Sequence, residues 1–355
     1  MSQENQNIQE EPHKRRVRYK GKYPKNYKEK YKELNPEKYQ DTIEKVIRKG
    51  STPAGMHISI MVKEIIDFLQ IKPGQTGFDA TLGYGGHTRA MLECLKGQGH
   101  MYATDVDPIE SAKTKKRLAE AGFGEDILTI KLQNFCTIDG IAKEAGGFDF
   151  VLADLGVSSM QIDNPDRGFS FKVDGPLDLR LNPEKGISAA ERLAGIEEEE
   201  LAGMLWENSD EPYAEELAHA IVTEIKHGKP IETTTRLREV IEETLSFLPE
   251  KERKDTVKKT CQRTFQALRI DVNNEFEVLY EFMEKLPGAL KPGGRAAILT
   301  FHSGEDKLVK KALKQGYKEG IYSEIANDVV RPSAEECAQN GRARSTKMRW
   351  AVRAE

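Results

Sequence analysis

The spacing of apolar residues changes repeatedly between helical and strand-like along the chain after residue 57. In the segment 58–69 apolar residues recur every three or four positions, which predicts an amphipathic helix that ends at a Pro-Gly turn. Short apolar runs then alternate with helical segments, and such alternation predicts a parallel sheet with helices on both faces. The expected elements are a strand at 76–82, a helix at 87–95, a strand at 99–106, a helix at 109–121, and strands at 127–132 and 148–155.

A fifth strand of the same sheet is expected only after a long interval. The segment 286–303 has the pattern of a helix, then a Pro-Gly-Gly turn, then a strand over 296–301. Lys291 lies 137 positions after Asp154. A β-α-β crossover needs only about 30 residues. About a hundred residues therefore exceed what the crossover requires.

The sequence in this interval has the pattern of several helices. Ser188 and Glu191 form a capping box, and apolar residues recur at helical spacing after it. We therefore predict an α/β fold, a Rossmann-like sheet with a helical domain inserted after the fourth strand. The alternative is a set of additional helices packed on the main core. The expected boundaries are 1–56 for an N-terminal extension, 57–160 and 262–355 for the core, and 161–261 for the inserted domain.

Composition limits the class of protein. The chain has 355 residues, 38% hydrophobic and 32% charged, which is enough for one large core and an additional domain. No apolar run approaches the roughly 18 residues of a membrane helix, and the N-terminus lacks the apolar stretch of a secretory signal. We therefore expect a cytoplasmic protein with no membrane partner. The four cysteines lie far apart without a CxxC pair, which argues against a disulfide framework or a zinc site.

Charge is concentrated in the N-terminal extension. The net charge is −4, yet the segment 13–32 contains ten lysines and arginines and one acid. Tyrosines recur there at every fourth position from Tyr19 to Tyr31. One interpretation is a solvated, disordered tail. The other is an arm that contacts RNA, in which lysines neutralise phosphates and tyrosines stack on unpaired bases.

A glycine-rich turn follows the first strand and indicates a cofactor site. Gly83, Gly85 and Gly86 let the backbone turn tightly and approach a ligand. Asp105 ends the second strand 22 positions after Gly83, where its carboxylate can accept hydrogen bonds from ribose hydroxyls. A dinucleotide favours G-x-G-x-x-G, but the order here is G-x-G-G-H, so the pattern favours S-adenosylmethionine. His87 follows the glycines and is expected to hold the cofactor carboxylate or to cap the helix.

Asp154 ends the fourth strand and is directly followed by Leu155 and Gly156. An aromatic amine is a poor nucleophile because its lone pair is delocalised into the ring. A carboxylate and a carbonyl that accept its two N–H bonds would favour the tetrahedral nitrogen of the transition state. Asp154 and the Leu155 carbonyl are candidates for this role. The alternatives are that Asp154 caps the following turn or binds the amino group of the cofactor.

Further candidates lie downstream of Asp154. His302, at the end of the fifth strand, is expected either to line the substrate pocket or to bond a loop carbonyl. A set of basic and aromatic residues is expected either to grip RNA or to pack under the inserted domain. The set comprises Arg167, Phe169, Phe171 and Arg180. A basic C-terminal group is expected to contact RNA or to form an exposed strand face. This group comprises Arg342, Arg344, Lys347, Arg349 and Arg353.

Several long motifs resemble the RsmH (MraW) family. They include "ATLGYGGHT", "LADLGVSSMQIDNPDRGFSFKVDGPLDLRLNP", "RTFQALRIDVNNE" and "LTFHSGEDKLVKK", and the resemblance covers roughly 57–355. It implies a class I methyltransferase that uses S-adenosylmethionine to methylate N4 of a cytidine in the decoding centre of 16S ribosomal RNA. The cofactor contacts that it implies are Gly85, Gly86, His87, Asp105, Phe135, Asp154 and Gln161.

Three parts of the chain depart from the family pattern. The basic extension lies outside it, the segment "HISIMVKEI" matches the opening of the family only loosely, and Gly304 stands where we expect leucine. We therefore expect an rRNA methyltransferase with Asp154 as catalytic residue, no metal, and 16S rRNA in the small ribosomal subunit as partner. The rival function is an assembly or RNA-binding factor that keeps the fold without turnover. The sequence leaves open whether the enzyme is a homodimer.

Overall fold

The computed structural model describes residues 59–355, which belong to one compact unit spanning His57–Glu355. The predicted basic arm, 1–56, lies outside the described residues. None of the described helices is long and apolar enough to cross a membrane.

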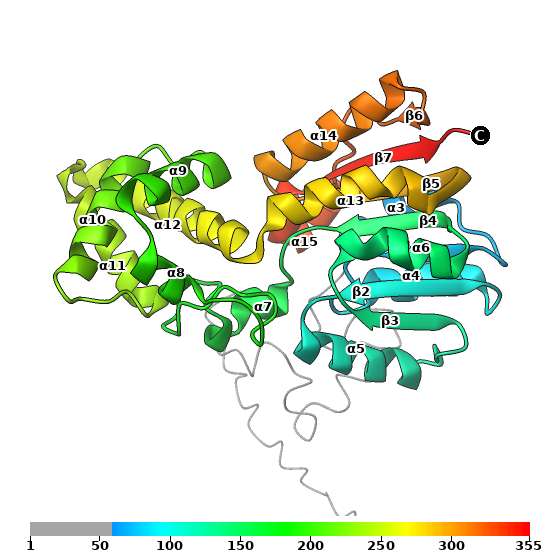
Figure 1. Cartoon of the computed structure of the whole chain (residues 1–355), viewed down its shortest axis with the longest axis horizontal. Coiled ribbons are helices and arrows are strands. Elements are labelled where there is room, and N and C mark those ends of the chain that lie inside the picture. The colour runs from blue at the N-terminus through cyan, green and yellow to red at the C-terminus, as the bar shows by residue number, and fades with distance from the viewer. Residues whose placement is uncertain (1–58) are drawn as a thin grey trace, which may run out of the picture. The chain divides into compact units, whose positions relative to one another are not determined.

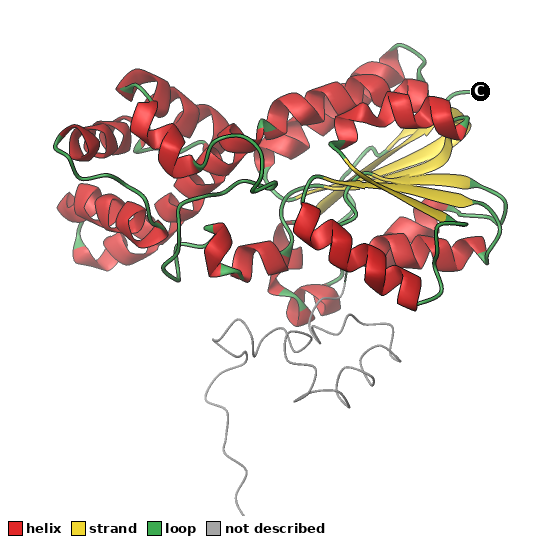
Figure 2. Cartoon of the chain, turned by 60° about the horizontal axis from the view of Figure 1, so that its bottom comes forward, coloured by secondary structure: helices red, strands yellow, loops and turns green. Residues whose placement is uncertain are grey.

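A seven-stranded sheet forms the centre of the α/β part of the chain (Figures 1 and 2). The strand order is β3-β2-β1-β4-β5-β7-β6. The first five strands are parallel, as the alternating pattern predicted, whereas β7 runs antiparallel to both of its neighbours. The strands are β1 (Thr76–Asp79), β2 (His100–Asp105), β3 (Leu128–Leu132), β4 (Phe148–Asp154), β5 (Leu290–Thr300), β6 (Tyr322–Ile325) and β7 (Lys347–Arg353).

Helices cover both faces of the sheet, which makes three layers (Figure 2). One face packs against α3, α4 and α5, and the other packs against α6, α13 and α14. The first group is α3 (Val62–Leu69), α4 (Gly86–Leu95) and α5 (Pro108–Glu120). The second group is α6 (Ile138–Ala145), α13 (Glu275–Ala289) and α14 (Ser303–Lys318), and the short α15 (Ala334–Gln339) precedes β7.

The first helix is shorter than its apolar pattern suggested. The pattern predicted a helix over 58–69, but Met61 has a left-handed backbone with φ 56°, so α3 starts only at Val62. The predicted Pro-Gly-Gly turn is not a separate turn either. Its residues lie within β5, where the register to β4 shifts between the pairs Phe148 to Leu290 and Phe150 to Arg295. The extra residues are accommodated as a bulge at the start of the strand.

The predicted helical insertion follows β4, and its helices share a hydrophobic core of their own. The capping box of Ser188 and Glu191 starts the helix α8, as expected. The helices are α7 (Ser159–Asp163), α8 (Ala189–Gly195), α9 (Glu198–Ser209), α10 (Ala214–Lys226), α11 (Thr234–Thr244) and α12 (Glu250–Asn273).

Three-residue 3-10 turns lie at Phe135–Thr137, Pro165–Arg167 and Leu245–Phe247, and a five-residue 3-10 turn lies at Gly341–Ser345.

The expected domain boundary at 261/262 falls within α12, which continues without a break to Asn273. The buried residues Cys261, Phe265 and Leu268 of α12 belong to the core of the insertion. Asn274 then adopts a left-handed backbone with φ 49° and separates α12 from α13. The division into a core and an inserted domain stays a proposal, and Asn274 is the natural place for its second boundary.

Candidate active site

Three acids stand near the carboxyl ends of adjacent parallel strands. Asp79 ends β1, Asp105 ends β2, and Asp154 ends β4. In the pairing of the strands, Asp79 is level with Ala103 of β2 and Leu152 of β4, so the other two acids extend further toward the same edge. Ligands of open α/β sheets bind at this edge. The sequence-predicted residues Asp105 and Asp154 are therefore brought to the same side of the sheet.

Asp105 is tied to the glycine-rich turn. Its Oδ2 accepts a hydrogen bond from the Gly83 amide at 2.8 Å, and its Oδ1 accepts one from the Asp107 amide at 2.9 Å. Burial raises the pKa of Asp105 to about 6 even though both amides favour the carboxylate. A partly buried carboxylate with free lone pairs is suited to accept hydrogen bonds from hydroxyl groups.

The turn before α4 depends on glycine for two different reasons. Gly85 has φ 82°, and a Cβ there would lie 2.7 Å from Cγ2 of Thr114. A Cβ on Gly86 would lie 1.9 Å from Oγ of Ser59. Ser59 therefore packs directly over Gly86, a contact that the sequence did not predict because the two residues are 27 positions apart.

His87 connects this turn to Asp154. Its Nε2 lies 2.9 Å from the carbonyl oxygen of Ile60, and its Nδ1 lies 3.4 Å from Oδ2 of Asp154. Because a carbonyl oxygen only accepts, Nε2 carries a hydrogen. Nδ1 then faces the carboxylate of Asp154, and the charge of His87 favours the ionised form of that carboxylate. His87 thus positions the carboxylate.

Asp154 has an acceptor atom that no described residue satisfies. Its amide donates to Oγ1 of Thr81 at 2.8 Å, while its buried Oδ1 has no hydrogen-bond partner. Burial raises the pKa of Asp154 to about 6, and the charge of His87 opposes this rise. Gly156 follows with φ 95°, a conformation that favours glycine. An unpaired buried acceptor of this kind fits a cationic or N–H-bearing group of a cofactor or substrate.

Asp79 is the third acid of this edge, and it was not among the predicted site residues. Its side chain is 1% exposed and accepts hydrogen bonds from the Thr88 hydroxyl at 2.6 Å and from the Thr81 amide at 3.0 Å. Burial raises its pKa. Asp79 therefore holds the start of α4 and the turn after β1, and its charge also raises the pKa of Asp154.

The predicted contacts Phe135 and Gln161 have partners within the protein. The ring of Phe135 packs edge-on against the ring of Phe282 of α13, with 5.2 Å between the ring centres. Gln161 accepts from the Ser158 amide at 2.9 Å and donates through Nε2 to Oδ2 of Asp107 at 2.9 Å. Gln161 therefore fixes the segment that follows Asp154.

Asp107 is a buried junction that the sequence did not reveal. Its Oδ1 caps α5 by accepting from the amide of Ile109 at 3.0 Å, and its Oδ2 accepts from Nη1 of Arg167 at 2.7 Å. Arg167 also donates to the carbonyls of Arg180 and Leu181. Arg167 is 7% exposed, which favours packing within the protein over contact with RNA. The Asp-Pro sequence before α5 signals a cap but not its distant partner.

Phe169, Phe171 and Arg180 also face the protein rather than solvent. Phe169 and Phe171 pack in the core of the insertion, the latter edge-on to Phe265 at 5.7 Å. Arg180 donates through Nη2 to Asp178 at 2.7 Å. For these residues too, the structure favours packing over RNA contact.

His302 caps α14 instead of bonding a loop carbonyl. Its Nδ1 accepts from the Glu305 amide at 3.5 Å, while Oε2 of Glu305 accepts from the Phe301 amide at 2.8 Å. Ligand atoms of Glu275, His302 and Glu305 lie within 4.8 Å of one another, a grouping compatible with a metal ion. Arg269, however, donates to both oxygens of Glu275, at 2.8 and 2.9 Å. An ion-pair network therefore accounts for this cluster.

The basic residues near the C-terminus are largely engaged in ion pairs or carbonyl contacts. Arg342 donates to Asp163 at 3.0 Å, and Arg353 donates to the carbonyls of Pro287 and Ile321. Lys347 and Arg349 both donate to Asp306, at 2.9 and 2.7 Å. Arg344 is exposed. The predicted RNA contact through this group therefore has little support beyond Arg344.

Comparison with known proteins identifies relatives along nearly the whole chain. Residues 54–354 match the model of the MraW methylase family. A "Ribosomal RNA small subunit methyltransferase H 1" of Agathobacter rectalis is 84% identical over 98% of this chain and 99% of its own length. A protein with the same name from Lachnoclostridium phytofermentans is 72% identical over 98% of this chain and 94% of its own length.

Among solved structures, an rRNA methylase from Streptococcus thermophilus has a TM-score of 0.38 and 13% identity over 84% of this chain and 99% of that one. The family match agrees with the resemblance noted from the motifs. The chain belongs to the MraW methylase family, and it is a methyltransferase whose cofactor is S-adenosylmethionine.

Proposed function

We propose that the chain methylates the exocyclic N4 amine of a cytidine in the decoding region of 16S ribosomal RNA. The names of its relatives, which are small-subunit rRNA methyltransferases, support this class of substrate. The observation that carries the proposal is the buried, unpaired Oδ1 of Asp154 at the edge where Asp105 also ends its strand. An unpaired acceptor of this kind can accept a hydrogen bond from an amine N–H, which supports the proposal.

Asp105 and Asp154 have separate roles in this proposal. S-adenosylmethionine supplies a methyl group on a positively charged sulfur when it is bound. Asp105 accepts hydrogen bonds from the ribose hydroxyls of the cofactor, next to the turn that contains Gly85 and Gly86. Phe135 and Gln161 belong to the walls of the same site. Asp154 accepts an N–H of the cytosine amine, so that the nitrogen lone pair is directed toward the methyl group.

His87 holds the side chain of Asp154 in the orientation that this role requires. Because Nε2 of His87 is held by the Ile60 carbonyl, the ring cannot turn away from Asp154 without losing that hydrogen bond. The charge of His87 lowers the pKa of Asp154 and thereby opposes the effect of burial.

The substrate is held, in this proposal, by parts outside the sheet. The helical insertion takes part in recognition of the RNA, and the basic arm 1–56 adds contacts to phosphates. Deletion of residues 1–50 is then expected to weaken binding of the small subunit and to flatten its salt dependence, while cofactor affinity stays the same. An unchanged salt slope in the truncated protein would remove the arm from the proposal.

Methyl transfer from labelled S-adenosylmethionine to small subunits that lack the modification tests the function. We expect incorporation with the wild-type protein, none with Asp154→Ala, and the label on N4 of one cytidine after nucleotide mapping. Labelling of another base or position would refute the proposed specificity. Tight subunit binding without any transfer by the wild type would support the rival, an assembly factor without turnover.

A further inference from the structure

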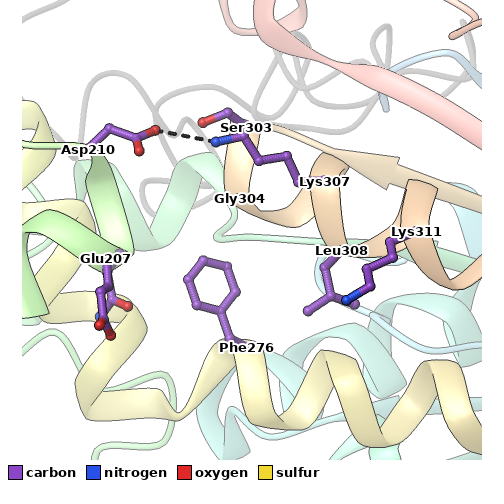
Figure 3. Close-up of a pocket in the computed structure, with 9 residues that line it drawn as sticks. Glu207, Asp210, Phe276, Ser303, Gly304, Lys307, Leu308 and Lys311 are labelled. Atoms are coloured by element: carbon purple, nitrogen blue, oxygen red, sulfur yellow. Dashed lines mark ion pairs between the residues drawn. The ribbon is translucent and has the colours of Figure 1, made fainter.

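A cavity of about 400 Å³ lies between the end of α9 and the start of α14 (Figure 3). The ring of Phe276, from the first turn of α13, points into it. Acids of α9 line one wall and lysines of α14 line the other. The main lining residues are Glu207, Asp210, Phe276, Lys307, Leu308 and Lys311.

The ring of Phe276 is placed by the absence of a side chain at Gly304. A Cβ at residue 304 would lie 2.6 Å from Cζ of Phe276, so any larger residue there would displace the ring. Gly304 is the position at which the sequence departs from the leucine that we expected. The other neighbour is the ring of His302, whose centre lies 5.9 Å from that of Phe276. Phe276 is half-buried, with part of its surface toward the cavity.

The cavity is adjacent to the edge that carries Asp154. Asp154 pairs with Leu299 of β5, and the chain continues from β5 through Phe301 and His302 into α14. A Cβ at Gly156 would lie 3.6 Å from the ring of Phe301, in ordinary contact. Packed residues thus connect the loop after Asp154 with the wall of the cavity.

The charges around Phe276 are arranged asymmetrically. Nζ of Lys307 lies 3.8 Å from Oδ2 of Asp210, and the two side chains are 71% and 63% exposed. An ion pair this exposed contributes little and exchanges partners readily. Lys311 lines the same wall one turn further along α14. The lysine wall is suited to a phosphate, and the carboxylates of Glu207 and Asp210 are suited to the N–H groups of a base.

We propose that this cavity binds an unpaired nucleotide of the substrate RNA that flanks the target cytidine. Its base stacks on Phe276, and its phosphate contacts Lys311 and Lys307, the latter after release from Asp210. The inference rests on the proposed function for the identity of the RNA. Aromatic stacking on unpaired bases tolerates different sequences, so Phe276 contributes to affinity more than to base choice.

Substitutions of Phe276 distinguish the effect of stacking on an RNA base from the effect of packing against Gly304. Phe276→Leu keeps an apolar side chain against Gly304 but removes the aromatic face, and Phe276→Tyr keeps both. We expect Phe276→Leu to raise both KM and Kd for small subunits about tenfold, with kcat and cofactor affinity unchanged. Phe276→Tyr is expected to behave as wild type. The matched control is Tyr280→Leu, because Tyr280 lies one turn along the same helix, is 59% exposed and does not line the cavity.

Lysine variants test the phosphate contact independently. Lys311→Gln is expected to lower the slope of log affinity against log salt by about 0.7 to 1, whereas Lys310→Gln, on the exposed part of α14 outside the cavity, is expected to change it less. Equal effects of the two lysine variants, or a Phe276→Leu variant that matches Tyr280→Leu, would overturn the inference. A wild-type protein that transfers no methyl group would instead refute the proposed function, and the subunit Kd values would still decide on the cavity.

Discussion

Replacing Asp154 with asparagine is expected to stabilise the cofactor-free protein while it abolishes methyl transfer. The substitution keeps the shape of the side chain and removes its charge. Burial, with repulsion from Asp79 and Glu305, raises the pKa of Asp154 to about 6 from the usual 3.8. A carboxylate that is disfavoured by its surroundings lowers the free energy of unfolding wherever it is ionised.

The magnitude follows from the difference between the folded and unfolded pKa values. At about 1.4 kcal/mol per pH unit, a rise from 3.8 to about 6 corresponds to about 3 kcal/mol at neutral pH. The folded protein retains this proton at pH values where the unfolded chain has lost it, so stability falls as pH rises from about 4 to about 6. Because the side chain is 27% exposed, solvent screens part of the effect, and we expect a gain of about 1 to 3 kcal/mol.

Urea unfolding followed by circular dichroism, without cofactor, measures this gain. At pH 8 the Asp154→Asn variant should be more stable than wild type by the full amount, and at pH 5 by about half of it. Asp149→Asn is the matched control on the same strand. Its Oδ2 accepts from the Thr76 amide at 2.7 Å and from Nζ of Lys291 at 2.8 Å, so its loss should destabilise the protein.

A variant less stable than wild type at pH 8, or a stability difference that is the same at pH 5 and pH 8, would refute this reasoning. The first result would mean that the contact with His87 outweighs burial of the carboxylate. The second would mean that the pKa of Asp154 is not raised in the folded protein.

Three further predictions concern binding, stability and pH. Asp105→Asn should weaken S-adenosylmethionine binding at least about tenfold by calorimetry, since a charge-assisted hydrogen bond is lost, whereas the exposed Asp126→Asn should not. Arg167→Met should lower the free energy of unfolding by about 3 to 5 kcal/mol in urea, because the buried carboxylate of Asp107 loses its positively charged partner, and a loss below 1 kcal/mol would contradict this. In pH-rate profiles, kcat/KM should fall as pH decreases through about 6, because Asp154 must be ionised to accept an N–H, and a flat acidic limb would count against that role.

The fold was largely predictable because each element depends on local spacing. Three helices of the insertion begin at side-chain caps, namely Ser158, Ser188 and Thr233, and the helices bury apolar residues at the spacing that the sequence indicated. The position of Asp105 and Asp154 at one edge of the sheet was predictable for a similar reason, since the carboxyl ends of parallel strands lie at the same edge. The antiparallel β7 was not, because its partners in β5 and β6 are fixed by long-range pairing.

Polar contacts between distant segments explain most of what the sequence did not reveal. Asp107 and Arg167 are 60 positions apart, and only the folded chain brings Ser59 over Gly86. The basic residues also show that a charge pattern alone does not reveal contacts within the protein. Arg349 looked like a candidate for RNA contact, but it is 5% exposed and bonded to Asp306, because a charge pattern does not say which side of a strand is covered.

The electrostatics of the edge also distinguish the two classes of cofactor that the glycine pattern alone left open. Asp79, Asp105 and Asp154 are concentrated at the ends of three adjacent strands, and burial raises the pKa of each. Among the described residues, the charge that lowers the pKa of Asp154 is that of His87. The charge of Asp79 raises the pKa values of Asp105 and Asp154, so the acids already repel one another and a pyrophosphate would add repulsion here. A ligand with positive sulfur and ammonium groups would lower these pKa values on binding. Its charge would offset the unfavourable burial of the Asp154 carboxylate, so the site would bind a cationic cofactor more strongly than a neutral or anionic one.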